Sequence, residues 1–416
     1  MIDTLKSFSD LYGWFKDPYS FLEKRLQKGE LTFRLSLPHS KNILVTGDPR
    51  LIGAVRKNRD LIGGRGTRFL QVIIGDSTIA KEGADHQESR RILNPFFQQL
   101  KREEVIKITE GELENSLLKM QEGEVFPLSD WIEHVTLNSI IQFTFGDITE
   151  ARKNEIFEAI FQWKRSFSNP LLFFIKAAQV PISSRFGWGK FVACRSLVHE
   201  LIRRELKQPS FRSKAGVLEN ARLKADWPDD RLIAETVSIL MFGHDTTAIV
   251  GAWWGFHMLS KKVWDGRLQA QPALSPELIE SSIKEAMRLT PPVVHLTRTA
   301  IRNTQVLEHA IAEGEAVFPC MYLAHHNPAV FEKPSQFQAD RFIGPKIYDQ
   351  DCLFPFGFGD RICLGKLFAE VQLSVIGRWL ISKVQLELAK DDIGPSRKFV
   401  LMVPSGGTPV RLLKKL

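Results

Sequence analysis

Hydrophobic and polar residues follow mostly helical spacing along this chain. The longest apolar stretch follows Pro228 and runs to Leu259, which predicts a helix buried on several sides. Pro228 and the two aspartates after it suit a helix start, because proline fits the first turn and acids complement the helix dipole. The same spacing predicts an amphipathic core helix over Leu128–Phe145, a long helix over Gly189–Leu206 and an apolar helix over Leu364–Val384.

Strand-like segments are short. Leu31–Leu37 and Asn42–Gly47 alternate around turn residues and predict a hairpin. Thr299–Phe318 predicts further short strands, and the last residues predict a hairpin around Pro404–Gly407, whereas the glycine-rich Gly63–Gly75 is expected to be irregular. No linker, repeat or low-complexity tract divides the chain. We therefore expect one mainly α domain over residues 1–416, with a smaller β-rich part built from both ends of the chain.

Phe354–Leu367 (FPFGFGDRICLGKL) places one cysteine just before an apolar helix. Gly365 and two further glycines need little room, so the loop can lie flat against a ligand. Cys363 lies where helix N–H groups favour an anionic sulfur, beside cationic Arg361 and aromatic Phe356. A lone free cysteine is usually only a packing residue, but the spaced residues together favour a rigid thiolate that makes one bond to a soft metal.

This run resembles the haem-binding loop of the cytochromes P450, Phe-x-x-Gly-x-Arg-x-Cys-x-Gly. Every fixed position matches, at Phe356, Gly359, Arg361, Cys363 and Gly365. The resemblance implies the cytochrome P450 fold and haem b (iron protoporphyrin IX) as the cofactor. It also implies that the thiolate of Cys363 is the proximal ligand of the iron.

The centre of the long helix breaks its own pattern at Gly243–Thr247 (GHDTT). Glycine, aspartate and threonine are poor choices inside a helix, so they mark a candidate functional site, with a kink against a neighbour as the structural alternative. The segment resembles the P450 signature Ala/Gly-Gly-x-Asp/Glu-Thr-Thr/Ser. This implies that, beside a widened helical turn, Thr246 hydrogen-bonds the bound dioxygen and Asp245 relays protons. Phe242 replaces the family's small residue and is expected to narrow the cavity, and His244 receives no role.

Further residues match P450 motifs in the family's order. His86 and Arg90 are four residues apart and share one face of a helix that Pro95 is expected to limit. Alone the pair would be a solvated polar stripe, but the resemblance implies that it holds the haem propionates. Arg298 matches the family's propionate-binding arginine. With Arg361, these residues would offer four donors to two propionates.

Glu285 and Arg288 lie three residues apart on one helical face. They resemble the family's Glu-x-x-Arg helix, and Gln338–Phe342 resembles its later Pro-Glu-Arg-Phe segment. The resemblance implies a structural network of Glu285, Arg288 and Arg341 that locks the loop of Cys363 in place. Breaking one member should leave an unpaired buried charge.

The amino-acid composition limits the cellular compartments in which the protein is expected. Among 416 residues there are four cysteines without metal-ligand spacing, so we expect a reducing compartment and neither a disulfide framework nor an iron–sulfur cluster. The first residues form no apolar run of signal or anchor length. We therefore expect a cytoplasmic, bacterial-type monomer without a transmembrane anchor. The net charge of +8 is scattered, which disfavours nucleic-acid binding and leaves a basic face that could meet an acidic electron donor.

The resemblance implies a monooxygenase that inserts one oxygen atom of O₂ into an apolar small molecule. The 29 phenylalanines and the apolar lid expected within Lys153–Ser184 suggest a terpenoid, steroid or fatty-acid-like substrate. That lid could also touch a membrane surface, or be a buried helix end. The chain carries no dinucleotide fingerprint. Two electrons would therefore come from NAD(P)H through a separate reductase and a ferredoxin or flavodoxin, docked near Lys366 and Arg91.

Two other functions fit the same residues less well. A peroxygenase on this fold would use H₂O₂, but the Asp245–Thr246 pair suits an enzyme that must protonate O₂ in place. A haem-thiolate sensor without enzymatic activity would gain nothing from that pair or from a closed apolar pocket. A basic nucleic-acid binder would show a steep salt dependence of affinity, and the dispersed charges disfavour it.

Overall fold

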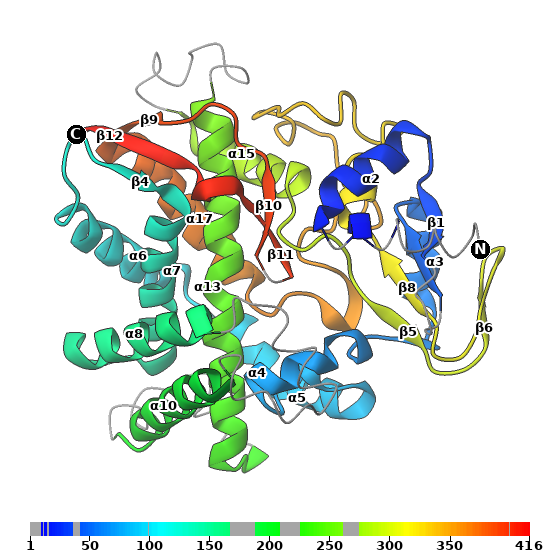
Figure 1. Cartoon of the computed structure of the whole chain (residues 1–416), viewed down its shortest axis with the longest axis horizontal. Coiled ribbons are helices and arrows are strands. Elements are labelled where there is room, and N and C mark those ends of the chain that lie inside the picture. Colours follow the sequence, from blue (N-terminus) through cyan, green and yellow to red (C-terminus); the bar gives the residue numbers. More distant parts are fainter. Residues whose placement is uncertain are drawn as a thin grey trace.

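The computed structural model describes residues 10, 12–14, 16–35, 42–98, 100–166, 188–208, 225–260, 274–398 and 400–416. Helices dominate these residues (Figure 1), and α13 (Asp229–Leu259) runs through the middle of the molecule. Helices α6, α7, α8 and α10 lie on one side of α13, and a small sheet lies on the other. The mainly α fold expected from the sequence is confirmed.

The helices match the predicted pattern closely. The core helix over Leu128–Phe145 is found with the same bounds as α7, and the predicted helix over Gly189–Leu206 starts one residue earlier as α10. The bounds are α2 Pro18–Gln27, α3 Pro49–Lys57, α4 Gln71–Ile74, α5 Gly83–Gln98, α6 Arg102–Leu117, α8 Glu150–Ser166, α10 Trp188–Leu206, α15 Pro276–Leu289, α16 Met321–His325 and α17 Lys366–Lys383.

Helices α13 and α7 approach each other closely because glycines line their contact. A Cβ added at Gly251 would lie 2.8 Å from Ile132, and one added at Gly243 would lie 3.2 Å from Ile140. Gly255 meets Leu128 in the same way. Since the partner numbers fall as the glycine numbers rise, the two helices run antiparallel. Gly243 therefore has a packing role at the very place where the sequence suggested chemistry.

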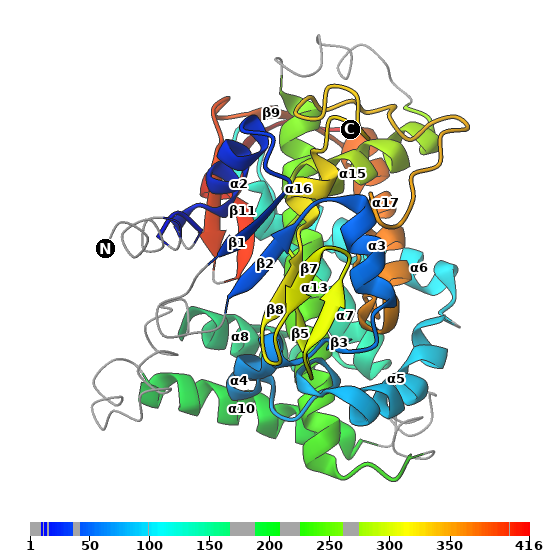
Figure 2. The ribbon, with the colours of Figure 1, turned by 90° about the vertical axis from the view of Figure 1, so that its right-hand side faces the viewer.

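The largest sheet has five strands in the order β1-β2-β8-β5-β3 (Figure 2). Its N-terminal strands pair with the strands of residues 298–319. Both ends of the chain supply strands, as expected, but in separate sheets: β9 and β12 join β4 in a three-stranded sheet, and β10 pairs with β11. The bounds are β1 Thr32–Leu35, β2 Ile43–Thr46, β3 Leu61–Ile62, β4 Val125–Pro127, β5 Arg298–Ala300, β6 Thr304–Val306, β7 His309–Ile311, β8 Ala316–Pro319, β9 Val384–Leu388, β10 Pro395–Lys398, β11 Leu401–Pro404 and β12 Pro409–Lys415.

Three local predictions need correction. Pro404–Gly407 does not close a hairpin: it links β11, which pairs with β10, to β12, which pairs with β9 and β4. Gly63–Gly75 is not irregular, because a 3₁₀ helix over Arg65–Leu70 and α4 fill it between the positive-φ residues Gly64 and Gly75. Pro95 lies inside α5, where its missing N–H affects only the last turn.

Two predicted features fall partly outside the described residues. The β1–β2 hairpin is antiparallel as expected, while its turn at residues 38–40 is not described. Helix α8 ends at Ser166, and the apolar part of the expected lid lies beyond it, outside the described residues. Among the described helices, none is both long and apolar enough to cross a membrane.

Candidate active site

The loop before α17 holds Cys363 through its backbone. Gly357 and Gly359 adopt φ values of +74° and +67°, in the left-handed region that favours glycine. This turn allows the N–H of Cys363 to donate to the carbonyl oxygen of Phe356 over 2.8 Å. Gly365 differs from the other two: it caps α17 with φ −87°, and an added Cβ would meet nothing within 4 Å. Neither its backbone conformation nor a close contact therefore requires a glycine at position 365, although the sequence analysis expected Gly365 to let the loop lie flat against a ligand.

Cys363 is exposed as a residue, while the surrounding chain crowds its thiol. Burial by the surrounding chain raises the pKa of the thiol, while a backbone bond from Gly365 and the charge of Arg90 lower it. A group that brought positive charge to the sulfur would favour the thiolate.

The four expected donors converge beside this loop. His86 and Arg90 come from α5, Arg298 from β5 and Arg361 from the loop itself. Burial lowers the pKa of His86 to about 4, and the charges of Arg361, Arg90 and Arg298 add to the effect. Burial also lowers the pKa of Arg361 to about 10, again with help from Arg298 and Arg90. Three arginine charges thus gather in a poorly hydrated place beside a neutral His86.

These donors have too few acceptors. Arg90 donates to the carbonyl of Ile362 over 2.9 Å, and Arg361 donates to the carbonyl of Gly63 over 2.8 Å. Yet Nδ1 of His86 and the Nε atoms of Arg90 and Arg361 are buried, and within the described chain they have no hydrogen-bond partner. Buried polar atoms are normally paired. The residues present therefore fit a cofactor that brings anionic oxygens, as the propionates of haem do.

Sequence reasoning missed the part that Gly63 and Gly64 play. A Cβ at Gly63 would lie 2.8 Å from Cγ of Arg361, and Gly64 has φ +117°. Both glycines let the Arg361 side chain lie against the backbone of this segment. The glycine-rich composition was the only signal in the sequence.

Thr246 lies at the centre of α13, which stays α-helical from Asp229 to Leu259. The expected widened turn is absent from this described helix. The Thr246 hydroxyl donates to the carbonyl of Phe242 over 3.2 Å, the back-bond to the residue four earlier that threonine favours. Phe242 itself is partly buried against the main core. The hydroxyl can exchange this weak bond for another acceptor.

Asp245 forms an ion pair that the sequence did not reveal. Its Oδ1 lies 2.5 Å from Nζ of Lys164 on α8. Burial raises the pKa of Asp245, but the ammonium groups of Lys164 and Lys398 and the hydrogen bond from Lys164 lower it, and the pKa lies below its ordinary value. Lys164 belongs to no motif, and His244 stands at the variable position of the signature, so the sequence singled out neither residue.

The structure brings Glu285, Arg288 and Arg341 together. Glu285 and Arg288 are fully buried, with Nε of Arg288 2.7 Å from Oε2 of Glu285. Nε of Arg341 lies 2.9 Å from the other carboxylate oxygen. Two hydrogen bonds through His325 join this group to the cysteine loop. Arg288 donates to the carbonyl of His325 over 2.7 Å, and the N–H of Phe354 donates to Nε2 of His325 over 3.1 Å. Sequence reasoning did not find His325.

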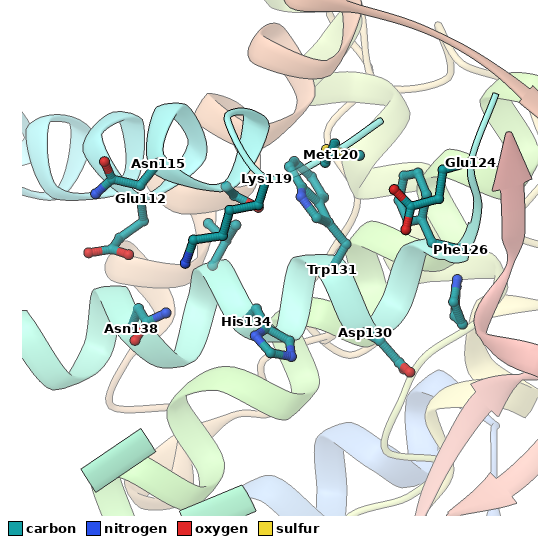
Figure 3. A pocket seen from close by; sticks show the side chains of 13 residues that line it. Glu112, Asn115, Lys119, Met120, Glu124, Phe126, Asp130, Trp131, His134 and Asn138 are labelled. Carbon is teal, nitrogen blue, oxygen red and sulfur yellow. The ribbon is translucent and has the colours of Figure 1, made fainter. Parts of the chain in front are cut away.

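Two cavities lie away from the cysteine loop. One, of about 290 Å³, lies between α6, β4 and α7 and is lined by Glu112, Lys119 and Trp131 among others (Figure 3). The other, of about 570 Å³, lies between α10 and the first turns of α13, with His199 and Arg231 in its wall. Neither contains a residue of the candidate site.

A cysteine presented by a turn before a helix, with buried donors that lack acceptors beside it, fits a haem-thiolate site. Comparison with known proteins agrees. The model of the family described as Cytochrome P450 matches residues 11–271 and 274–410. The chain belongs to the cytochrome P450 family, and it is a haem-thiolate monooxygenase, an oxidoreductase.

Relatives and solved structures cover most of the chain. A Mycobacterium bovis protein that carries the name cytochrome P450 138 is 26% identical over 84% of this chain and 79% of its own. Another from the same organism, cytochrome P450 135B1, is 24% identical over 91% of this chain and 81% of its own. The haem domain of cytochrome P450DA superposes with a TM-score of 0.77 at 17% identity, covering 97% and 95% of the two chains. A six-coordinated cytochrome P450 from Thermus thermophilus gives 0.73 at 22%, covering 96% and 99%.

Proposed function

We propose that this monooxygenase holds haem b on Cys363 and inserts one oxygen atom of O₂ into an apolar small molecule. The single observation that carries the cofactor proposal is the exposed residue Cys363 beside buried donors that lack acceptors. Bound haem would supply the activation of O₂ that no side chain can supply. His86, Arg90, Arg298 and Arg361 would hold its propionates.

The protein's own part in the reaction is to deliver protons without admitting bulk water. In this proposal the Thr246 hydroxyl leaves the carbonyl of Phe242 and donates its proton to the oxygen substrate. The Asp245 carboxylate takes up a proton from solvent, and the carboxyl group so formed passes that proton to the Thr246 oxygen, which restores the carboxylate. Asp245 and Thr246 are consecutive residues in the middle of α13, and both are only partly buried.

The substrate and the electron donor follow from composition and charge. The apolar substrate, of terpenoid, steroid or fatty-acid-like kind, rests on the phenylalanine-rich sequence. An acidic ferredoxin or flavodoxin, reduced by NAD(P)H through its reductase, would dock near Cys363. Lys366 is about half exposed there, with Nζ 5.8 Å from the ring centre of Phe356, and Arg91 is exposed as well.

The test is a two-stage assay on the haem-loaded protein. A library of terpenoids, steroids and fatty acids is screened for an optical spin-state shift, and each ligand found is then incubated with NADPH and a ferredoxin–reductase pair, or with H₂O₂ alone. The proposal expects hydroxylated product with the reductase pair. Product with H₂O₂ alone would favour a peroxygenase, and no ligand and no turnover with either would favour a sensor.

A further inference from the structure

The ammonium of Lys164 contacts three acceptors from two other helices. Nζ donates to Oδ1 of Asp245 over 2.5 Å and lies 2.9 Å from Nε2 of His244, and it also bonds Oε1 of Glu133 on α7. The lysine side chain is only 9% exposed. A lysine ammonium carries three N–H donors and no acceptor. The three contacts therefore use every donor that Lys164 has.

This arrangement fixes the proton positions on His244. Nδ1 of the fully buried ring lies 2.5 Å from the carbonyl oxygen of Leu240, which can only accept, so Nδ1 carries the proton. Nε2 is then the acceptor for Lys164. Burial, and after it the charge of Lys164, lowers the pKa of His244, which agrees with a neutral ring.

The charges of the cluster balance. Oε2 of Glu133 lies 3.5 Å from Nζ of Lys398 on β10, so each oxygen of this carboxylate has its own cation. With His244 neutral, two ammonium groups face the carboxylates of Glu133 and Asp245. The acceptor atoms of Glu133, His244 and Asp245 lie within 4.8 Å of one another, as metal ligands do, but Nζ of Lys164 fills the central position.

We propose that Lys164, held by Glu133 and His244, is the positioning residue of Asp245: it fixes Oδ1 toward α8 and keeps the side chain a carboxylate, which leaves Oδ2 for the relay with Thr246. This inference rests on the proposed proton relay, because the orientation of Asp245 matters to catalysis only if Asp245 carries protons. If Lys164 only stabilised the packing of the helices, it would make the same contacts, but the protonation of Asp245 would not matter to catalysis.

Removing the ammonium makes a distinct prediction. Without Lys164, the buried carboxylates of Asp245 and Glu133 face each other with only Lys398 to balance their two charges, so they should share a proton. Lys164→Met should therefore create a protonated carboxyl group that the wild-type protein lacks at neutral pH.

Infrared difference spectroscopy on the haem-loaded protein tests this without any substrate. We expect a protonated-carboxyl C=O band in Lys164→Met at pH 7, absent from wild type and from the charge-keeping Lys164→Arg, and lost again in Lys164→Met/Asp245→Asn. Lys164→Gln serves where the methionine variant fails to fold, because it removes the charge and keeps two donors. Absence of the band from both neutral variants, or its survival in the double variant, would overturn the proposal.

Turnover separates this inference from the proposed function. With NADPH, a ferredoxin–reductase pair and a ligand from the screen, Lys164→Met and Asp245→Asn should raise the peroxide released per NADPH by a similar factor. Lys153→Met is the matched control, because Lys153 is also a buried lysine of α8 with two carboxylate partners, Glu112 and Glu150. This variant should release as little peroxide per NADPH as wild type. If Asp245→Asn changes coupling and Lys164→Met does not, the positioning role is wrong. If Asp245→Asn releases no more peroxide per NADPH than wild type, the proposed relay is wrong. The infrared result then decides only whether Lys164 keeps Asp245 ionised.

Discussion

The backbone N–H of Phe354 donates to Nε2 of His325 over 3.1 Å, and both residues are buried. The carbonyl of His325 accepts from Arg288, so this ring connects the Glu285 network to the start of the cysteine loop. The ring must be neutral to accept from Phe354, and burial followed by the charge of Arg288 holds its pKa well below the ordinary value. His325 thus transmits the rigidity of the network to Cys363.

Replacing His325 with leucine should loosen the loop. The Phe354 N–H would lose its acceptor in a buried place, which costs about 1–3 kcal/mol. We expect a lower free energy of unfolding in guanidinium and a smaller carbon monoxide difference spectrum per mole of folded protein. His326→Leu is the control, because His326 is also buried but bonds within its own segment, to the carbonyl of Tyr322. Equal haem retention in both variants would show that His325 does not hold the loop.

Glu285→Gln should be far more damaging than loss of a surface pair. Glu285 neutralises two arginines in a fully buried place, and removing one partner of such a group costs about 3–5 kcal/mol. The variant should fail to retain haem even where it stays folded, as measured by haem absorbance against protein after gel filtration. Glu155→Gln, which removes the exposed partner of Arg204, should leave haem content and stability unchanged. A Glu285→Gln protein with full haem would contradict the structural role.

Acid should destabilise the protein partly through His257. Its ring stacks on Phe337, and neither ring nitrogen has a hydrogen-bond partner within the described chain. Burial lowers its pKa from 6.5 to about 3, so below pH 6.5 the unfolded chain binds a proton that the folded chain refuses. The contribution of His257 to the free energy of unfolding is fully present above pH 6.5 and is lost as the pH falls toward 3. His257→Phe should therefore gain stability over wild type increasingly as pH falls, and parallel curves of unfolding free energy against pH would refute this.

Thr246→Ala tests the relay. In the proposed relay, loss of the hydroxyl would remove the proton donor to the oxygen substrate, so electrons should be diverted to peroxide and product formation should fall on the order of 100-fold. Thr247→Ala is the control, since Thr247 is buried on the adjacent position of α13. The readout is product and peroxide per NADPH oxidised. Unchanged coupling in Thr246→Ala would count against the relay.

The sequence predicted the helices well because their apolar periodicity is long and uninterrupted, as in α7 and α13. It also placed Cys363, Arg361, Arg90 and Arg298 in one site through the order of motifs. It failed where the partner is remote: nothing local pairs Lys164 with Asp245, 81 residues away, or Phe354 with His325, 29 residues away. The contact of Gly243 with α7 could not be predicted either, because it depends on Ile140 of another helix.

The account depends most on the bond between Cys363 and haem iron. Carbon monoxide added to the reduced, purified protein measures this bond through the position of the Soret band. We expect the strongly red-shifted band of thiolate ligation, and its loss in Cys363→Ser with the fold retained by circular dichroism. A well-folded, haem-loaded wild type without that band, or a Cys363→Ser protein that keeps it, would contradict the account.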